Sequence, residues 1–262
     1  MKRGAFTLIE LLVVTGIIAL LTAILIPALK RTRLQAKAVL CSSNINQLTL
    51  GLIRYEIENE TFPHALDTIS TELPPGGYPG NLMYDRAGWW WFNYIVDYSR
   101  GDSESVVFCP SRQIVDSRLK YNVLCGNYGV NQSVCKSLHG REEQTEFTGK
   151  PLSSSDISHP GRTFLVADCG YGMINWWHAT DTPPESPGNT IEDTAYIPGL
   201  CINENRSLWP GQRNDAVCGR HLNKTVNVGF ADGHISRIEA GIFFVEKMDQ
   251  AYRNLTPFWS PK

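Results

Sequence analysis

The chain has 262 residues, 19% of them charged, and its formal net charge is −2. This near-neutral balance argues against a protein that attracts nucleic acid through a global basic field. Because 42% of the residues are hydrophobic and 10% are aromatic, the composition also argues against a disordered chain, and the length allows a substantial core.

An apolar run occupies residues 6–29 and contains a single charge, Glu10. As a helix the run would be about 36 Å long, enough to cross roughly 30 Å of hydrocarbon. A carboxylate at the centre of a membrane helix costs roughly 2.5–3.5 kcal/mol on insertion scales, so we expect Glu10 to have a partner, namely the N-terminal amine of a neighbouring copy. The alternative is an ordinary secretory signal, cleaved after the apolar run near residues 22–29.

Apolar residues continue at helical spacing beyond this run, at Leu34, Ala38, Cys41, Ile45, Leu48, Leu52 and Tyr55. The spacing predicts one helix that runs on to about residue 58 and ends before Phe62–Pro63, with a kink at Pro27. Residues 6–29 would form its membrane-spanning or assembly half, and residues 30–60 an amphipathic continuation. That second half needs a packing partner, and we expect residues 61–262 to supply it.

The remainder of the chain predicts short strands separated by Pro- and Gly-rich loops. The candidate strands are residues 105–109, 163–167, 226–231 and 234–238. Asp232–Gly233 is a signal for a two-residue type I′ hairpin turn. Val226, Val228 and Phe230 alternate, so we expect them to face the core against the apolar stripe of the helix. The fold class is therefore α+β, a long N-terminal helix packed on an antiparallel sheet with long loops.

The N-terminal sequence GAFTLIELLVV, with Pro27 near the end of the apolar run, resembles the start of type IV prepilins and type II secretion pseudopilins. The resemblance implies that a prepilin peptidase removes residues 1–5 as a basic leader and N-methylates Phe6. Glu10 is then the fifth mature residue. Gly4 is followed here by Ala5 rather than directly by Phe, so cleavage after Gly4 is the alternative.

The same resemblance implies a pilin-like architecture and a structural role. The sequence contains no GxSxG, no HExxH and no Gly-rich phosphate loop, so we expect neither catalysis nor a cofactor. The chain would be a single-pass inner-membrane protein whose C-terminal domain lies in the periplasm or on the cell surface. Its helix would assemble with copies of itself and other pseudopilins, on an inner-membrane assembly platform, into a type II secretion pseudopilus or a type IV pilus-like fibre.

Later segments, in chain order, resemble a large pseudopilin-like group of Planctomycetes, Verrucomicrobia and Lentisphaerae. They are FCPS (residues 108–111), NYGVN (127–131), ISHPGRTFLVAD (157–168) and RHLNKTVNVGFADGHIS (220–236). That group carries a C-terminal His-x9-Asp-Gly motif. In this chain ten residues separate His221 from Asp232–Gly233, and we place the extra residue in the turn at 222–225.

The residues His221, Asp232 and His234 could ligate a metal if the chain brought them together, and Asp168, at the end of an apolar strand, could join them. A six-residue strand separates His221 from Asp232 by roughly 15–20 Å, unless residues 222–225 fold back. We therefore predict a structural role for the motif and no metal. A metal-dependent hydrolase would require these side chains to converge in a pocket.

The seven cysteines contain no CxxC pair; they are Cys41, Cys109, Cys125, Cys135, Cys169, Cys201 and Cys218. A disulfide between Cys41 and Cys109 would join the helix to the sheet, and Cys125–Cys135 is the next choice. The seven tryptophans leave a different function open: a membrane-anchored adhesin that binds carbohydrate through exposed indole rings.

Overall fold

The computed structural model describes residues 7–68, 88–95, 106–112, 123–124, 126–138, 145–176, 221–243, 245, 247–248, 251–252 and 255–261. The helices are α1 (Leu8–Asn59) and α2 (Trp91–Tyr94), with 3-10 turns η4 (Ser154–Asp156), η6 (Leu222–Lys224) and η7 (Ala240–Phe243). The strands are β1 (Leu66–Asp67), β2 (Trp89–Trp90), β3 (Tyr128–Asn131), β4 (Phe164–Asp168), β5 (Met173–Ile174), β6 (Thr225–Phe230), β7 (Ile235–Glu239), β8 (Lys247–Met248) and β9 (Ala251–Tyr252).

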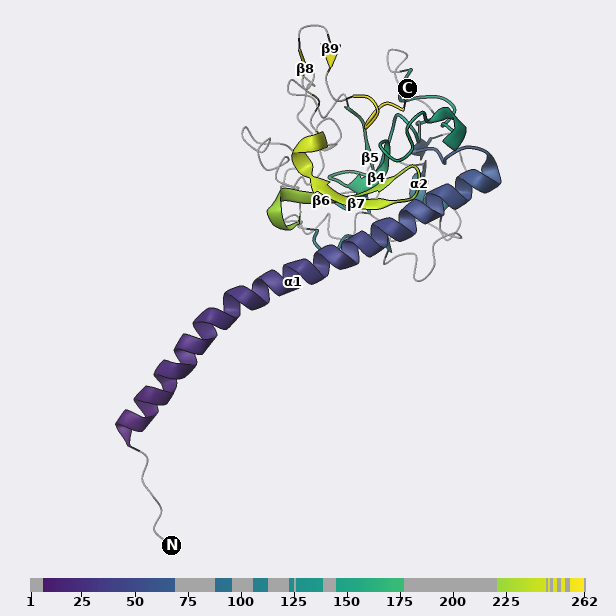
Figure 1. The fold of residues 1–262 in the computed structure, drawn as a ribbon. Helices are drawn as coiled ribbons and strands as arrows, with labels where there is room; N and C mark the ends of the chain where they lie inside the picture. The colour runs from purple at the N-terminus through teal and green to yellow at the C-terminus, as the bar shows by residue number, and fades with distance from the viewer. Residues whose placement is uncertain are drawn as a thin grey trace.

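Helix α1 is continuous over 52 residues, which confirms the predicted long helix. Thr7 caps its start, and Glu60 ends it in the left-handed conformation with φ 66°. Pro27 lies inside the helix, where it lacks the N–H that would bond the preceding turn. Figure 1 shows the helix as one curved rod that extends well beyond the rest of the protein.

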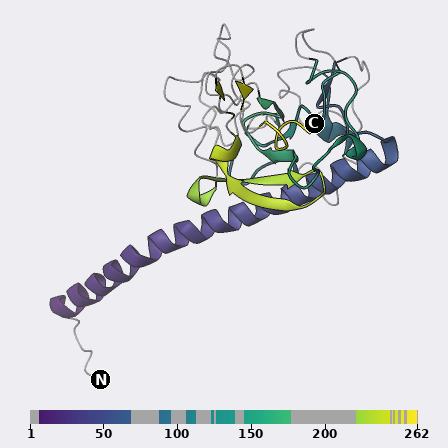
Figure 2. The same cartoon turned by 45° about the horizontal axis from the view of Figure 1, so that its top comes forward.

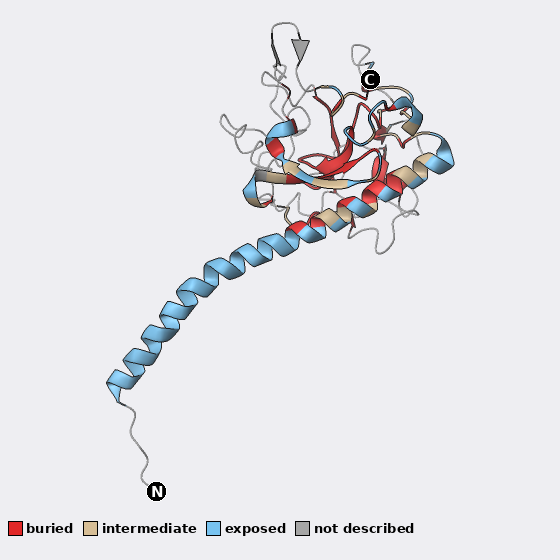
Figure 3. Cartoon of the chain, in the orientation of Figure 1, coloured by how far each residue is buried: buried red, intermediate tan, exposed pale blue. Residues whose placement is uncertain are grey.

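The two halves of α1 differ sharply in burial (Figure 3). Residues 7–37 are all exposed, and burial begins at Ala38. The buried positions are Ala38, Cys41, Ile45, Leu48, Thr49, Gly51 and Leu52. The predicted apolar stripe is therefore correct from Ala38 onward, while Leu34, expected in the stripe, is exposed. The second half of α1 belongs to the core of the protein, and the first half projects from it.

The second half of α1 packs on a five-stranded sheet formed within the described residues, in the order β5-β3-β4-β6-β7. Figures 1 and 2 show the helix running along one side of this sheet. The prediction of an antiparallel sheet was wrong in one respect, because β3 and β5 are parallel. The other neighbours in this sheet are antiparallel, so the fold is α+β with a mixed sheet.

The face of β6 that meets α1 is not the predicted one. A Cβ atom on Gly229 would collide with Thr49 of α1, and the Asn227 side chain reaches the Ala38 carbonyl at 3.4 Å. Because side chains alternate along a strand, Val226, Val228 and Phe230 face the opposite side of the sheet. They are buried there as well, and Phe230 contacts Phe258. Both faces of β6 are covered, so its alternation carried no information about which face the helix would take.

A β-bulge in β4 determines which of its side chains face α1. Phe164 is paired with Phe230 and Val166 with Gly229, so the register shifts between Phe164 and Val166. The shift reverses the alternation of side chains. Phe164 consequently packs among the C-terminal aromatic rings, 4.8 Å from Trp259 between ring centroids. Val166 and Asp168 instead face the helix.

The hairpin between β6 and β7 forms where it was predicted, but with a different turn. The Gly233 N–H donates to the Phe230 carbonyl at 2.9 Å, which puts Ala231 and Asp232 at the centre of the turn. Gly233 follows with φ 94°, a conformation that favours glycine. The predicted type I′ turn, with Asp232 and Gly233 at its centre, was therefore wrong.

The other strand predictions had mixed outcomes. The strands predicted at 163–167, 226–231 and 234–238 correspond to β4, β6 and β7 and are confirmed to within about a residue. The strand predicted at 105–109 was wrong, because its described part, residues 106–109, forms a helical turn and a bend. The last residues there turn so that the Arg112 N–H bonds the Cys109 carbonyl at 3.0 Å.

Candidate functional site

The first candidate site is the start of α1, around Glu10. The Glu10 carboxylate accepts hydrogen bonds from the Thr7 N–H and the Thr7 hydroxyl, both at 2.8 Å. The Thr7 hydroxyl in turn accepts from the Glu10 N–H at 3.3 Å, which completes a capping box. Within one chain, therefore, the carboxylate provides a hydrogen-bond acceptor for the N-cap residue of its own helix. Gly4, Ala5 and Phe6, where leader cleavage is predicted, lie outside the described residues.

The exposed half of α1 is apolar on all sides. Between Leu8 and Leu29, fourteen large apolar side chains are exposed. Across the described residues, α1 is one helix that is long and apolar enough to cross a membrane. An exposed apolar surface of this extent is typical of contact with a membrane or with another protein.

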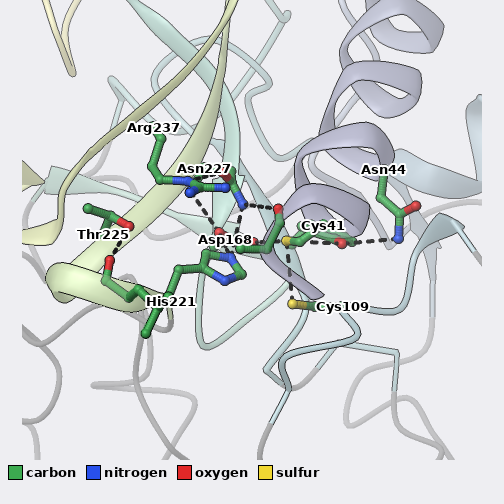
Figure 4. A network of polar contacts seen from close by, with 11 residues as sticks. Cys41, Asn44, Cys109, Asp168, His221, Thr225, Asn227 and Arg237 are labelled. Carbon is green, nitrogen blue, oxygen red and sulfur yellow. Dashed lines mark hydrogen bonds and ion pairs between the residues drawn. The ribbon is translucent and has the colours of Figure 1, made fainter. Parts of the chain in front are cut away.

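The second candidate site is a buried polar cluster between α1 and the sheet (Figure 4). Cys41, Cys109, Asp168 and His221 each contribute one atom, and these four atoms lie within 4.8 Å of one another. The Cys41 thiol donates to one Asp168 oxygen at 2.7 Å, and the Cys109 sulfur lies 3.5 Å from the Cys41 sulfur. The His221 Nε2 atom lies 2.8 Å from the second Asp168 oxygen. We call these four residues the Cys-Asp-His cluster.

Each member of this cluster comes from a different segment of the chain. Cys41 lies on the buried stripe of α1, and the bulge in β4 turns Asp168 toward that helix. His221 is placed by the turn η6, in which Asn223 adopts a left-handed φ of 62° and folds the chain back. The His221 N–H then bonds the Thr225 carbonyl at 3.1 Å, at the start of β6. The backbone N–H of Cys109 is held by the Asn127 side chain at 3.0 Å.

The groups around the cluster hold its members in position. The Asn227 N–H donates to Asp168 at 2.7 Å, and the Arg237 side chain donates to Asn227 at 3.2 Å. On the other side, the Tyr128 hydroxyl donates to the Cys41 sulfur at 3.4 Å. Burial raises the pKa of the Cys41 thiol far above its usual range, and its contacts with Cys109 and Asp168 raise it further. In the absence of a cation this thiol therefore stays protonated.

The hydrogen bonding of His221 in the cluster is unbalanced. Its Nε2 atom lies 2.8 Å from an Asp168 oxygen, an acceptor, and 2.9 Å from the Asn227 side-chain nitrogen, a donor. One ring nitrogen cannot donate to the first and accept from the second at the same time. The other ring nitrogen, Nδ1, is buried and has no hydrogen-bond partner within the described structure. A buried polar atom of this kind costs roughly 1–3 kcal/mol.

The structure separates the residues of the C-terminal motif. His221 lies in the buried cluster, whereas Asp232 lies in the β6–β7 turn and bonds His234 Nδ1 at 2.6 Å near the surface. Partial burial is the largest single influence on Asp232 and raises its pKa, but the hydrogen bonds from the His234 N–H and ring and the His234 charge together lower it more, so the pKa is below its usual value. Residues 222–225 do fold back, but they bring His221 to the start of β6 and not to Asp232.

Sequence reasoning identified each member of the Cys-Asp-His cluster separately but missed that they belong together. It noted Asp168 at the end of an apolar strand as a candidate partner for His221, and it paired Cys41 with Cys109 as a disulfide. In the structure their sulfurs are 3.5 Å apart rather than at the ~2.05 Å of a bonded pair, so the two residues form no disulfide with each other. Cys125 of the second predicted pair lies outside the described residues.

The described tryptophans do not form an exposed binding platform. Trp90, Trp91, Trp176 and Trp259 are buried, and Trp89 is half-buried against Tyr94. The Trp91 and Trp259 ring nitrogens donate to main-chain carbonyls, those of Gly172 and Phe243. These indoles serve the core, so the described part of the chain gives no support to a carbohydrate-binding adhesin. Trp177 and Trp209 lie outside it.

Comparisons with known proteins place the chain in no established class. No protein-family model, no curated protein and no solved structure matches it.

Proposed function

We propose that this chain is a pilin-like structural subunit that is anchored by α1 and assembles laterally through it. The product would be a fibre of the type II secretion pseudopilus or type IV pilus kind. The observation that carries the proposal is the exposed apolar half of α1. Burying a large apolar side chain stabilises a protein by about 1.5 kcal/mol or more, so burying these fourteen would gain about 20 kcal/mol. A surface of this kind requires a cover. Lipid covers it before assembly, and neighbouring helices cover it in the fibre.

Glu10 favours assembly over a simple membrane anchor. An anchor needs no carboxylate in its apolar run, and keeping one there costs up to roughly 2.5–3.5 kcal/mol, the value for the centre of a membrane helix. In the proposed mature chain, the N-terminal amine at Phe6 lies one residue before Thr7, which the Glu10 carboxylate already contacts. In a fibre whose subunits are shifted along its axis, the Glu10 carboxylate of one copy would lie beside the N-terminal amine of a neighbouring copy and could form an ion pair with it. Pairing the two charges removes the cost that each would otherwise carry in an apolar environment.

The remaining parts of the proposal combine this arrangement with the resemblance of the N-terminal sequence to prepilins. The second half of α1 is built into the core, so the C-terminal domain is held rigidly at one end of the helix. In the fibre this domain faces outward, on the periplasmic side of the inner membrane or on the cell surface. The partners are copies of the chain or other pilin-like subunits, a prepilin peptidase and an inner-membrane assembly platform.

Processing is tested by the intact mass of the mature protein. We expect a chain that lacks residues 1–5 and carries one additional methyl group on Phe6, because this cut places Glu10 fifth. Peptide mapping of the N-terminus distinguishes it from a cut after Gly4. A mature chain that begins near residue 28 would identify an ordinary secretory signal and contradict assembly through α1.

Assembly is tested by Glu10→Gln. Glutamine retains a capping box with Thr7 but removes the negative charge. We expect membrane insertion to be unchanged and the yield of cross-linked neighbouring subunits to fall about tenfold or more, equivalent to a loss of about 1.4 kcal/mol. The matched control is Thr7→Ala, which removes the cap but keeps the charge, and it should assemble almost normally. Normal assembly of Glu10→Gln, or equal losses in both variants, would contradict a charge-pairing role.

A further inference from the structure

We propose that the Cys-Asp-His cluster is a zinc site of the structural kind, in which one ion joins α1 to the sheet through four protein ligands. The ligands would be the sulfurs of Cys41 and Cys109, a carboxylate oxygen of Asp168 and a ring nitrogen of His221. Two thiolates, an imidazole and a carboxylate make a donor set that zinc accepts, whereas magnesium and calcium take oxygen ligands. This inference does not depend on the proposed fibre.

The geometry of the cluster is close to what a tetrahedral ion requires. With Zn–S bonds of about 2.3 Å and Zn–N or Zn–O bonds of about 2.0–2.2 Å, the edges of the tetrahedron are about 3.3–3.8 Å. The two sulfurs are already 3.5 Å apart, and all four donor atoms lie within 4.8 Å of one another. The Asp168 oxygen that binds the ion lies 2.7 Å from the Cys41 sulfur or 2.8 Å from His221 Nε2, depending on which oxygen binds, and that contact would open by about half an ångström to one ångström as the ion entered.

An ion would also resolve the unbalanced hydrogen bonding around His221. The ring nitrogen that binds the ion and the Asp168 carboxylate oxygen would both face a cation. If Nε2 binds the ion, the buried Nδ1 carries the proton. If Nδ1 binds the ion, the buried atom that has no partner in the described structure acquires one. Binding through Nε2 removes the conflict between Asp168 and Asn227 at that atom, and binding through Nδ1 gives the unpartnered atom a ligand.

Residues around the four proposed ligands hold them in position through hydrogen bonds. Asn227 fixes the Asp168 carboxylate through its N–H and is itself held by Arg237, whose positive charge offsets part of the negative charge of the ligands. The Tyr128 hydroxyl donates to the Cys41 sulfur and accepts from Asn44 at 3.2 Å. Such contacts orient ligands and tune their affinity for the metal.

Metal binding in this site is an exchange of protons for the ion. Two thiols bind one Zn²⁺ as thiolates and release two protons to solvent, with no change in oxidation state. All four ligands are buried, and the side chains of Asp168 and His221 are 0% exposed. A site with four protein ligands and no exposed face has no position for a substrate, so the ion serves stability. It would link α1 to segments 68, 127 and 180 residues further along the chain.

The test uses the full chain, purified in detergent under reducing conditions and then loaded with Zn²⁺ and dialysed. We expect about one zinc per chain by elemental analysis, and Co²⁺ in its place should give the visible spectrum of a tetrahedral ion with thiolate ligands. Cys109→Ser and His221→Gln should each lower the zinc content about tenfold or more. The matched control is Cys135→Ser, since Cys135 is a buried free thiol outside the cluster and should leave the zinc content unchanged.

A second readout does not depend on the variants folding normally. Zn²⁺ should raise the melting temperature of the reduced wild-type chain by several degrees, and a chelator should reverse the effect. Three results would overturn the proposal: less than about one zinc per ten loaded chains, equal zinc content in Cys109→Ser and Cys135→Ser, or a Cys41–Cys109 disulfide mapped in protein alkylated directly from cells.

Discussion

Gly229→Ala is expected to loosen α1 from the sheet and to lower the free energy of unfolding by about 3 kcal/mol, at the upper end of the usual range for overpacking. A Cβ atom at this position would overlap the Thr49 hydroxyl oxygen and lie 3.1 Å from the Thr49 Cβ and 3.2 Å from a Val166 methyl carbon. Neither the helix backbone nor β4 can retreat without disturbing the core between them. Thermal or urea unfolding of the full chain in detergent measures the change.

Two further variants separate the collision from a general effect of replacing glycine. Thr49→Ala removes the hydroxyl oxygen, which otherwise only bonds the Ile45 carbonyl one turn earlier at 2.7 Å. The double variant should therefore recover a substantial part of the loss, as a non-additive pair does. Gly16→Ala is the control without a collision, since a Cβ atom there meets nothing within 4 Å. A Gly229→Ala protein as stable as the wild type would contradict the close approach of α1 and β6.

Asp168→Asn is the second change with a large expected effect, a loss of about 2–4 kcal/mol in zinc-free protein kept reduced with a chelator present. The carboxylate accepts from the Cys41 thiol on one oxygen, and its other oxygen accepts from the Asn227 N–H and faces His221. The asparagine amide replaces one of these acceptor oxygens by an NH2 donor. That donor would then face another buried donor, the Cys41 thiol or the Asn227 N–H. Leaving such groups unsatisfied costs roughly 1–3 kcal/mol each.

The matched control is Asp232→Asn, the same replacement at an exposed position. Asp232 bonds the His234 ring and N–H at the surface, and its side chain is 41% exposed, so solvent screens its interactions. We expect a change within about 0.5 kcal/mol. Similar losses in the two variants, measured by urea unfolding, would show that the buried network around Asp168 contributes no more than a surface contact.

Local pattern was sufficient to predict several elements. Helix α1 follows from a long apolar run that continues as a stripe at helical spacing, with only Pro27 as an interruption. The strands β4, β6 and β7 follow from short apolar runs, and the position of the hairpin follows from Asp232–Gly233. These features depend on neighbours within a few residues along the chain.

Other features could not be predicted because they depend on contacts between distant segments. The parallel pairing of β3 with β5 involves segments more than forty residues apart. The face of β6 toward α1 depends on the close approach at Gly229, because both faces of this strand are buried and its alternation is compatible with either.

The sequence by itself determined that this protein has a long, partly apolar N-terminal helix, a short-stranded sheet domain and a carboxylate in the apolar run. Only the tertiary structure decided that Cys41, Cys109, Asp168 and His221 meet. The physical reason is that a one-residue bulge in β4 and a left-handed residue in the 222–225 turn aim two of these side chains. Neither irregularity has a periodic signature in the sequence. Each is stabilised by the packing of α1 against the completed sheet, which forms only in the folded protein.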